Sequence, residues 1–176
     1  ADISKYKNRF NLFSEFYNNF YNGNKIFNLD RDKQFTIHCF EERGLVIATL
    51  NSASGIDNFN TIPHIDKSAV TELCKLLDTP PYKNLLKIAA WHHSSDTDSL
   101  NPEFTKYLKL VNVSLALHGH QHSAEINTLE NIYWQSEALP IISAGSLCAD
   151  DADLSYTAPR GYNIIELDCE VGIGKV

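Results

Sequence analysis

The amino-acid sequence predicts an α/β protein with a mixed β-sheet and layered helices. Three observations support this fold class. Apolar runs of strand length alternate with segments of helical periodicity, two adjacent runs have the pattern of an antiparallel hairpin, and the last part of the chain is a run of predicted strands. No linker or low-complexity tract divides the 176 residues, so we expect one domain.

An aromatic helix is expected near the start of the chain. In the segment 9–21, Phe10, Phe13, Tyr17 and Phe20 recur at helical spacing and share one face. An aromatic stripe with this spacing is typical of a helix that packs in the core. We therefore interpret it as a core helix and not as a stacking platform for a ligand.

A hairpin and a capped helix come next. The runs FTIHCF and LVIATL flank the polar link EERG, which predicts antiparallel strands over 35–40 and 45–50. Asp66 is placed to cap the following helix, which the segment TPPY ends. The apolar stripe of this helix comprises Val70, Leu73, Cys74 and Leu77.

The second half of the chain alternates strand and helix and then continues with strands. Short buried strands are predicted at LLKIAAW and VSLAL. Between them, NPEFTKYLKLV predicts a helix with Asn101 at the N-cap and Pro102 at the first helical position. One face of this helix carries Phe104, Tyr107, Leu108 and Val111. Three further strands are predicted in NIYWQSE, LPIISAG and GYNIIELD.

The composition narrows the functional classes. The chain has 15 Lys and Arg against 22 Asp and Glu, a formal net charge of -7, and no basic stripe, which disfavours sequence-independent binding to nucleic acids. No apolar run approaches the roughly 20 residues that a membrane span requires, so no membrane partner is expected. The cysteines are widely separated and are interpreted as buried thiols of a reducing, cytoplasmic environment. They are Cys39, Cys74, Cys148 and Cys169.

Five of the seven histidines follow two of the predicted strands. His92 and His93 come directly after LLKIAAW, and HGHQH, which contains His118, His120 and His122, comes directly after VSLAL. Loops at strand ends are where open α/β sheets hold ligands, and neutral imidazole binds Zn, Mn, Fe, Co and Ni. The two clusters therefore predict a metal site at the strand ends.

Gly119 and the other histidines of the chain are given lesser roles. Gly119 is expected to allow a sharp turn beside a closely approaching ligand. His118 precedes that glycine and is expected to face inward. His38 and His64 are interpreted as ordinary strand and loop residues, although a loop histidine such as His64 could line a substrate cleft.

The motifs AAWHHS and LHGHQH together resemble the last two signature blocks of the calcineurin-like metallophosphoesterases. In that family a strand ends in His-His or His-Ser, and a later strand is followed by Gly-His-x-His. The helix between the two blocks and the tail ISAGSL…GYNIIELD fit the same pattern. The resemblance implies a mixed-sheet layered sandwich of the metallophosphoesterase type.

The resemblance also implies roles for individual histidines. His92 and His120 would be ligands of one metal ion, and His122 would be a ligand of a second. His93 would lie in the substrate pocket, as the candidate catalytic residue. The implied cofactors are two divalent ions from the group Mn, Fe, Zn, Co and Ni, which would hydrolyse a phosphate mono- or diester through a metal-activated hydroxide.

Three earlier blocks of the family, Asp-x-His, Gly-Asp-x-x-Asp and Gly-Asn-His, do not occur in these 176 residues. We therefore expect residues 1–176 to form the C-terminal half of a metallophosphoesterase domain in a longer protein, and to be inactive in isolation. Half of a layered domain would leave an apolar sheet face open. The expected partners are thus the N-terminal half of the domain, or a second copy in a homodimer through that face.

Two alternatives stay open. The chain could be a metallophosphoesterase-like scaffold that has lost catalysis and binds proteins. It could also be an independent structural zinc protein, but such sites favour cysteine ligands, and the two histidine loops contain none.

Overall fold

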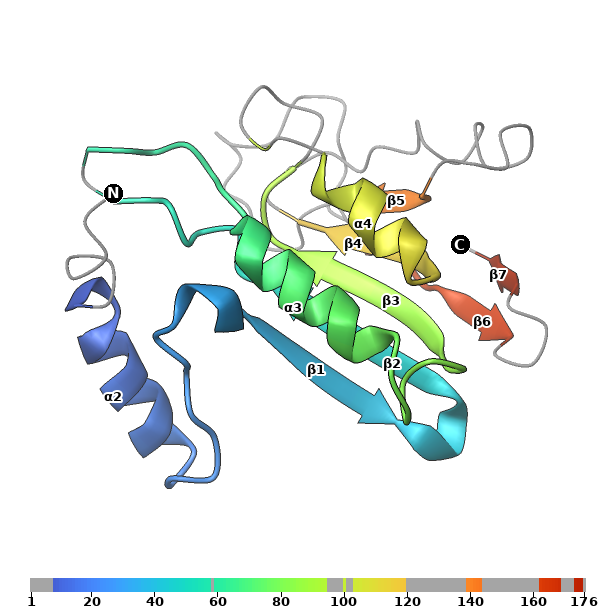
Figure 1. Cartoon of the computed structure of the whole chain (residues 1–176), viewed down its shortest axis with the longest axis horizontal. Coiled ribbons are helices and arrows are strands. Elements are labelled where there is room, and N and C mark those ends of the chain that lie inside the picture. The colour runs from blue at the N-terminus through green and yellow to red at the C-terminus, as the bar shows by residue number, and fades with distance from the viewer. Residues whose placement is uncertain are drawn as a thin grey trace.

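The computed structural model has a five-stranded mixed sheet at its centre (Figure 1). The structure describes residues 8–57, 59–94, 100, 103–119, 139–143 and 162–168, and the backbone of 173–175. The predicted α/β class and mixed sheet are confirmed, because one strand pair of this sheet is antiparallel and the others are parallel.

The predicted hairpin consists of β1 (Phe35–Phe40) and β2 (Leu45–Leu50), which pair antiparallel. The link between them ends at Gly44, whose φ of 62° lies in the left-handed region that glycine adopts without steric cost. Along β2 every second side chain is buried, as expected for a strand with one face on the core: Val46, Ala48 and Leu50.

The parallel part of the sheet is formed by β2, β3 (Leu86–Trp91), β4 (Val113–His118) and β5 (Ile141–Ser143). Parallel neighbours need crossover connections, and a helix lies in the connection of two of the three parallel pairs. The helices are α3 (Lys67–Leu77), between β2 and β3, and α4 (Phe104–Leu110), between β3 and β4. Because the four strands run in the same direction, their C-terminal ends lie at one edge of the sheet.

The helix α3 follows its prediction closely. Asp66 occupies the N-cap and accepts a hydrogen bond from the backbone N–H of Ser68. Leu73 and Leu77 are fully buried against the sheet, together with Val70. The helix ends at Leu77, just before TPPY, so its sequence specifies both its ends and its buried face.

The start of α4 differs from its prediction. The helix begins at Phe104 with Glu103 at the N-cap, and no side chain caps it, so the expected cap at Asn101 is wrong; Asn101 itself lies outside the described residues. Phe104 and Leu108 are buried as expected, whereas Tyr107 is 37% exposed. The apolar spacing thus located the buried face better than the helix terminus.

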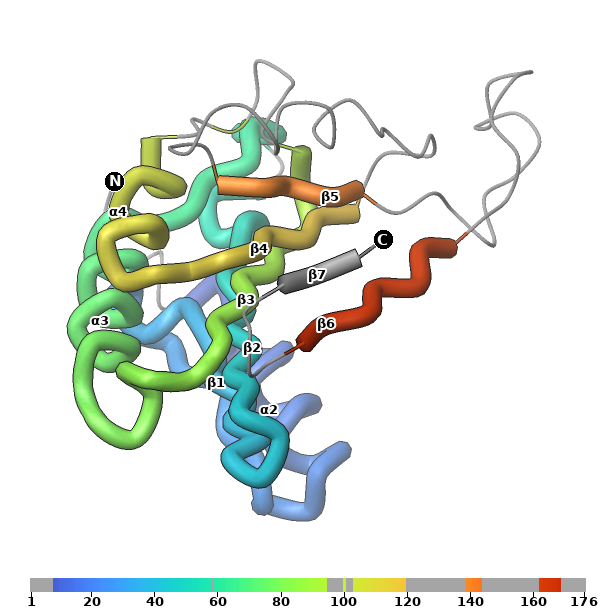
Figure 2. Tube along the Cα trace, turned by 90° about the vertical axis from the view of Figure 1, so that its right-hand side faces the viewer, coloured from blue at the N-terminus to red at the C-terminus, as the bar shows by residue number. Residues whose placement is uncertain are grey.

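Different elements pack on the two faces of the sheet. The helices α3 and α4 lie on one face, and β6 (Glu166–Asp168) lies on the opposite side (Figure 2). Strand β6 pairs antiparallel with β7 (Ile173–Lys175). On the face away from the helices, the central side chains are buried and pack against Ile165 and Leu167: Ile88, Leu115 and Ile142. This face, which the half-domain hypothesis leaves open, is therefore covered at its centre.

The aromatic helix α2 (Asn11–Phe20) forms where predicted, but the interpretation as a core helix is wrong. It has no buried residue, and Figure 1 shows it apart from α3 and α4. Phe13 packs edge-to-face on Phe27 with ring centroids 4.9 Å apart. Its neighbours on the helix, Leu12 and Phe16, are 80% and 60% exposed. Spacing predicted an aromatic face, and among the described residues Phe27 covers part of it through contacts with Phe13 and Tyr17.

We expect α2 to mediate self-association of the purified chain, because Leu12 and Phe16 expose apolar surface that burial would stabilise. Replacing both by glutamine should weaken self-association by about tenfold or more. Light scattering over a range of concentrations measures this. Leu110→Gln is the matched control, since Leu110 on α4 is 79% exposed. A wild-type monomer at every concentration would contradict the prediction.

The cysteines and the later strands complete the comparison with the sequence. Cys39 is exposed on β1, contrary to the buried thiol expected, because β1 is an edge strand. Burial raises the pKa of the half-buried Cys74 thiol to about 11. The strand predicted at NIYWQSE, Cys148 and Cys169 lie outside the described residues. In the described part of the chain, no helix is both long and apolar enough to cross a membrane.

Candidate functional site

The candidate site is the edge of the sheet where the parallel strands end. Trp91 and His118, the last residues of β3 and β4, are direct partners in the parallel register. His92 and Gly119 therefore leave the sheet side by side. The structure places the described part of each cluster, His92–His93 and His118–Gly119, side by side at this edge. The convergence of the three predicted metal ligands stays a prediction.

A backbone hydrogen bond joins the two clusters. The N–H of Gly119 donates to the carbonyl of His92 at 3.0 Å. A Cβ added to Gly119 would lie 3.6 Å from Nδ1 of His92, which is ordinary van der Waals contact. The φ of Gly119 is not in the left-handed region, so its backbone does not need a conformation reserved for glycine. The expected close approach of a ligand to this glycine stays a prediction. The exposed imidazole of His92 lies over the backbone where HGHQH begins.

The turn after β3 is held by Ser52, two residues beyond the end of β2. The Ser52 side chain is buried, and its Oγ accepts hydrogen bonds from the backbone N–H groups of His92 and His93, both at 3.2 Å. The same Oγ lies 2.8 Å from Nδ1 of His93. The three contacts fix a buried His93 next to an exposed His92, with the two rings 4.9 Å apart at 78°.

The loop that carries Ser52 is braced by its own hydrogen bonds. The N–H of His64 donates to the carbonyl of Ser52 at 2.9 Å, and the Ser54 hydroxyl donates to the carbonyl of His64 at 2.7 Å. His64 is exposed, so its backbone, not its ring, connects this loop. Arg9 donates to the carbonyl of Ser54 and pairs with Asp57 at 3.6 Å.

Hydrogen bonds from the backbone N–H groups of Phe59 and Asn60, with a contribution from Arg9, outweigh desolvation and lower the pKa of Asp57. This carboxylate therefore stays ionised and keeps the loop tied to Arg9.

His118 faces inward, as expected. It is 6% exposed, and its ring stacks on that of Trp91 with centroids 6.5 Å apart and an interplanar angle of 18°. Nδ1 of His118 lies 3.1 Å from the carbonyl of Gly119, so this nitrogen is the donor of a local hydrogen bond. These contacts give His118 a structural place beneath the site.

The next strand contributes a polar contact at the same edge. Ser143 ends β5 in register with His118, and its carbonyl accepts a hydrogen bond from the Asn163 side chain at 2.9 Å. Each of the four parallel strands therefore contributes residues to this edge of the sheet, either at its last position or just beyond it.

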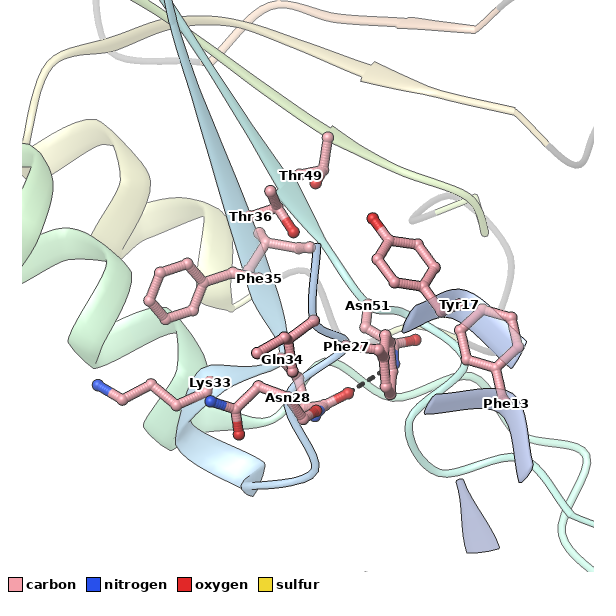
Figure 3. Close-up of a pocket in the computed structure, with 12 residues that line it drawn as sticks. Phe13, Tyr17, Phe27, Asn28, Lys33, Gln34, Phe35, Thr36, Thr49 and Asn51 are labelled. Carbon is pink, nitrogen blue, oxygen red and sulfur yellow. Dashed lines mark hydrogen bonds between the residues drawn. The ribbon is translucent and has the colours of Figure 1, made fainter. Parts of the chain in front are cut away.

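A cavity of about 280 Å³ borders the end of β2 (Figure 3). Its lining comes from α2, β1, β2 and the segment between α2 and β1, and it includes Tyr17, Thr36 and Thr49. Asn51, which immediately precedes Ser52, also lines it and donates to Oε1 of the buried Gln34 at 2.8 Å. The end of β2 therefore separates this cavity from the histidine turn.

The predicted metal ligands are only partly placed. His92 is exposed at the edge, next to the start of the second cluster. His120 and His122 lie outside the described residues, and the structure brings no three His, Cys, Asp or Glu side chains together as a possible metal site among those it does describe. The donor chemistry of His92 fits an ion of the expected group, because its imidazole is accessible, whereas Nδ1 of His93 is engaged by Ser52.

Ser52 is the functional candidate that reasoning from the sequence missed. The available signal was the polar pair Asn51 and Ser52 directly after the apolar run LVIATL, the same position that the histidines occupy after their strands. A serine at a strand end is common, so its type alone carried no chemical signal.

No protein-family model, curated protein sequence or solved structure gives a significant match to the chain.

Proposed function

We propose that this chain is the C-terminal half of a dinuclear metal-dependent phosphoesterase that hydrolyses a phosphate mono- or diester. One observation carries the proposal: β3 and β4 are parallel neighbours that end in register, and the Gly119 N–H donates to the His92 carbonyl. The two motifs that resemble the metallophosphoesterase blocks thus begin at adjoining points of one sheet edge. Convergence is what a shared metal centre requires.

The proposed roles of the histidines follow from their surroundings. His92 presents an exposed imidazole and would be a ligand, with His120, of one metal ion. His122 would be a ligand of the second. The metal ions would supply the charge that draws in a phosphate ester and activates water for its hydrolysis.

His93 has a different environment and therefore a different proposed role. It is 7% exposed, and its Nδ1 is occupied by the Ser52 hydroxyl. We propose that this ring, held in place by Ser52, lies in the substrate pocket.

The isolated 176-residue chain should be inactive. Its three proposed ligands are neutral, so no carboxylate among them offsets the charge of two divalent ions, and metal affinity should be low. The upstream reading frame should encode Asp-x-His, Gly-Asp-x-x-Asp and Gly-Asn-His, which would complete the ligand set.

The test uses the protein that includes those upstream blocks. It should hydrolyse bis(4-nitrophenyl) phosphate or 4-nitrophenyl phosphate when Mn²⁺ or Zn²⁺ is supplied, and lose the activity with a chelator. His92→Ala and His122→Ala should each lower the activity, and the affinity for the metal ion that the histidine binds, by about 10- to 100-fold or more.

His38→Ala is the matched control, because His38 is an exposed imidazole on β1, away from this edge. Equal losses in all three variants, or metal-independent hydrolysis, would contradict the proposal. Absence of the upstream blocks together with absence of metal would instead favour the non-catalytic scaffold.

A further inference from the structure

The side chain of Ser52 makes an unusual set of contacts for one hydroxyl group. It is 2% exposed, and its Oγ meets three groups of the turn after β3. Two are the backbone N–H groups of His92 and His93, at 3.2 Å each, and the third is Nδ1 of His93, at 2.8 Å.

The hydrogen-bonding capacity of a hydroxyl decides the direction of the third contact. A serine hydroxyl has two acceptor lone pairs and one hydrogen. The N–H groups of His92 and His93 use both lone pairs of Ser52, so its hydrogen is left for Nδ1 of His93. A proton on Nδ1 would instead make a third donor point at an oxygen whose lone pairs are already used.

We propose that Ser52 is a positioning residue that holds the His92–His93 turn and keeps His93 in the neutral tautomer with its proton on Nε2. The imidazole then accepts from Ser52 at one nitrogen and is a donor at the other. The loop bonds between Ser52 and His64 keep the hydroxyl in place at the end of β2.

The functional part of this inference rests on the proposed phosphoesterase activity. A metal ligand needs a free lone pair, and in this tautomer neither nitrogen of His93 offers one, since Nδ1 accepts a hydrogen bond and Nε2 carries a proton. Ser52 would thereby separate the roles of two adjacent histidines, with His92 left to bind a metal ion and His93 restricted to donating a hydrogen bond.

Long-range ¹H–¹⁵N spectra of the histidine-labelled 176-residue chain test the tautomer directly and without any enzyme assay. The signals of His93 are assigned by their loss in His93→Gln. In the wild type we expect His93 to have Nε2 protonated and Nδ1 unprotonated. In Ser52→Ala the ratio of the two tautomers should fall by about fivefold to tenfold, as expected for the loss of one buried hydrogen bond.

Ser54→Ala is the matched control, because Ser54 is equally buried in the same loop but donates to the carbonyl of His64. It should leave the His93 spectrum unchanged, and Ser52→Thr, which retains the hydroxyl, should restore the wild-type ratio. If Ser52→Ala does not fold, the wild-type spectrum still tests the direction of the Ser52–His93 hydrogen bond, because a His93 with an unprotonated Nδ1 accepts from the hydroxyl. A His93 protonated on Nδ1, or a spectrum unchanged by Ser52→Ala, overturns the proposal. An Nε2-protonated His93 that depends on Ser52 supports it, whether or not phosphoesterase activity is found.

Discussion

Leu73→Ala should lower the free energy of unfolding by about 2–5 kcal/mol, the largest loss of stability that we expect from a single substitution in this chain. Leu73 is fully buried where α3 packs against the sheet, and Val70 and Leu77 flank it on the same face. Truncation removes apolar contacts and leaves a cavity that the surrounding helix and strands fill only in part. Urea unfolding followed by circular dichroism measures the change.

Leu76→Ala provides the control for this experiment. Leu76 lies on the same helix but is 39% exposed, and the change of residue type is identical, so the two variants share the same gain in helix propensity. The control should change the stability by about 0.5 kcal/mol or less. Equal effects of the two substitutions would mean that α3 does not pack on the sheet as described.

Asp66 is the second position with a large expected effect. Its side chain is buried, at 6% exposure. One carboxylate oxygen accepts a hydrogen bond from the Ser68 N–H at 2.9 Å. The other oxygen pairs with the Arg31 guanidinium, at 2.8 Å from Nε and 2.7 Å from Nη2. Asp66→Asn retains an N-cap and removes the charge, which should cost about 1.5–3 kcal/mol. Asp66→Ala removes the cap as well and should cost about 1 kcal/mol more.

The stabilisation by Asp66 should depend on pH. Burial by itself raises the pKa of this carboxyl, but hydrogen bonds from the side chain and N–H of Ser68 and the pairing with Arg31 outweigh it, so the folded-state pKa lies below 3.8. A depressed pKa means that the carboxylate stabilises the fold fully above its unfolded value and loses this effect as the pH falls through the folded value.

The stabilities of wild type and Asp66→Asn, measured by unfolding at a series of pH values, should therefore converge below pH 3.8. Glu72→Gln, which removes a carboxylate on the surface of the same helix, is the control and should change the stability little at any pH. A constant difference between wild type and Asp66→Asn down to the lowest pH would contradict the assignment.

Local sequence patterns predicted most of the described fold, because they record which face of each element is buried. The alternation in LVIATL fits β2, and the spacing of Leu73 and Leu77 fits α3. The same patterns gave the wrong environment for α2 and Cys39. Periodicity shows that a helix has an apolar face, but not whether another element covers it, and a strand sequence does not show that the strand lies at the edge of its sheet.

The candidate site was predictable to the extent that it depends on strand ends. The apolar runs before His92 and Gly119 predicted that both leave one edge of the sheet, and the register of β3 and β4 agrees. The role of Ser52 could not be predicted in the same way. Its partners are 40 and 41 residues away in the chain, and only the pairing of β2 with β3 brings them within hydrogen-bond distance.

These long separations have a consequence for how the site comes into existence during folding. The turn at His92 depends on Ser52, which precedes it by 40 residues, and on the Gly119 N–H, which is donated from the end of another strand. Closing loops of this length costs conformational entropy that only the assembled sheet repays. A synthetic peptide spanning both histidine clusters would lack Ser52 and β2. It would therefore contain the same histidines but would not position them as the folded chain does. The site depends on the complete sheet. We therefore expect it to form late in folding and to be lost when the strands of the sheet separate.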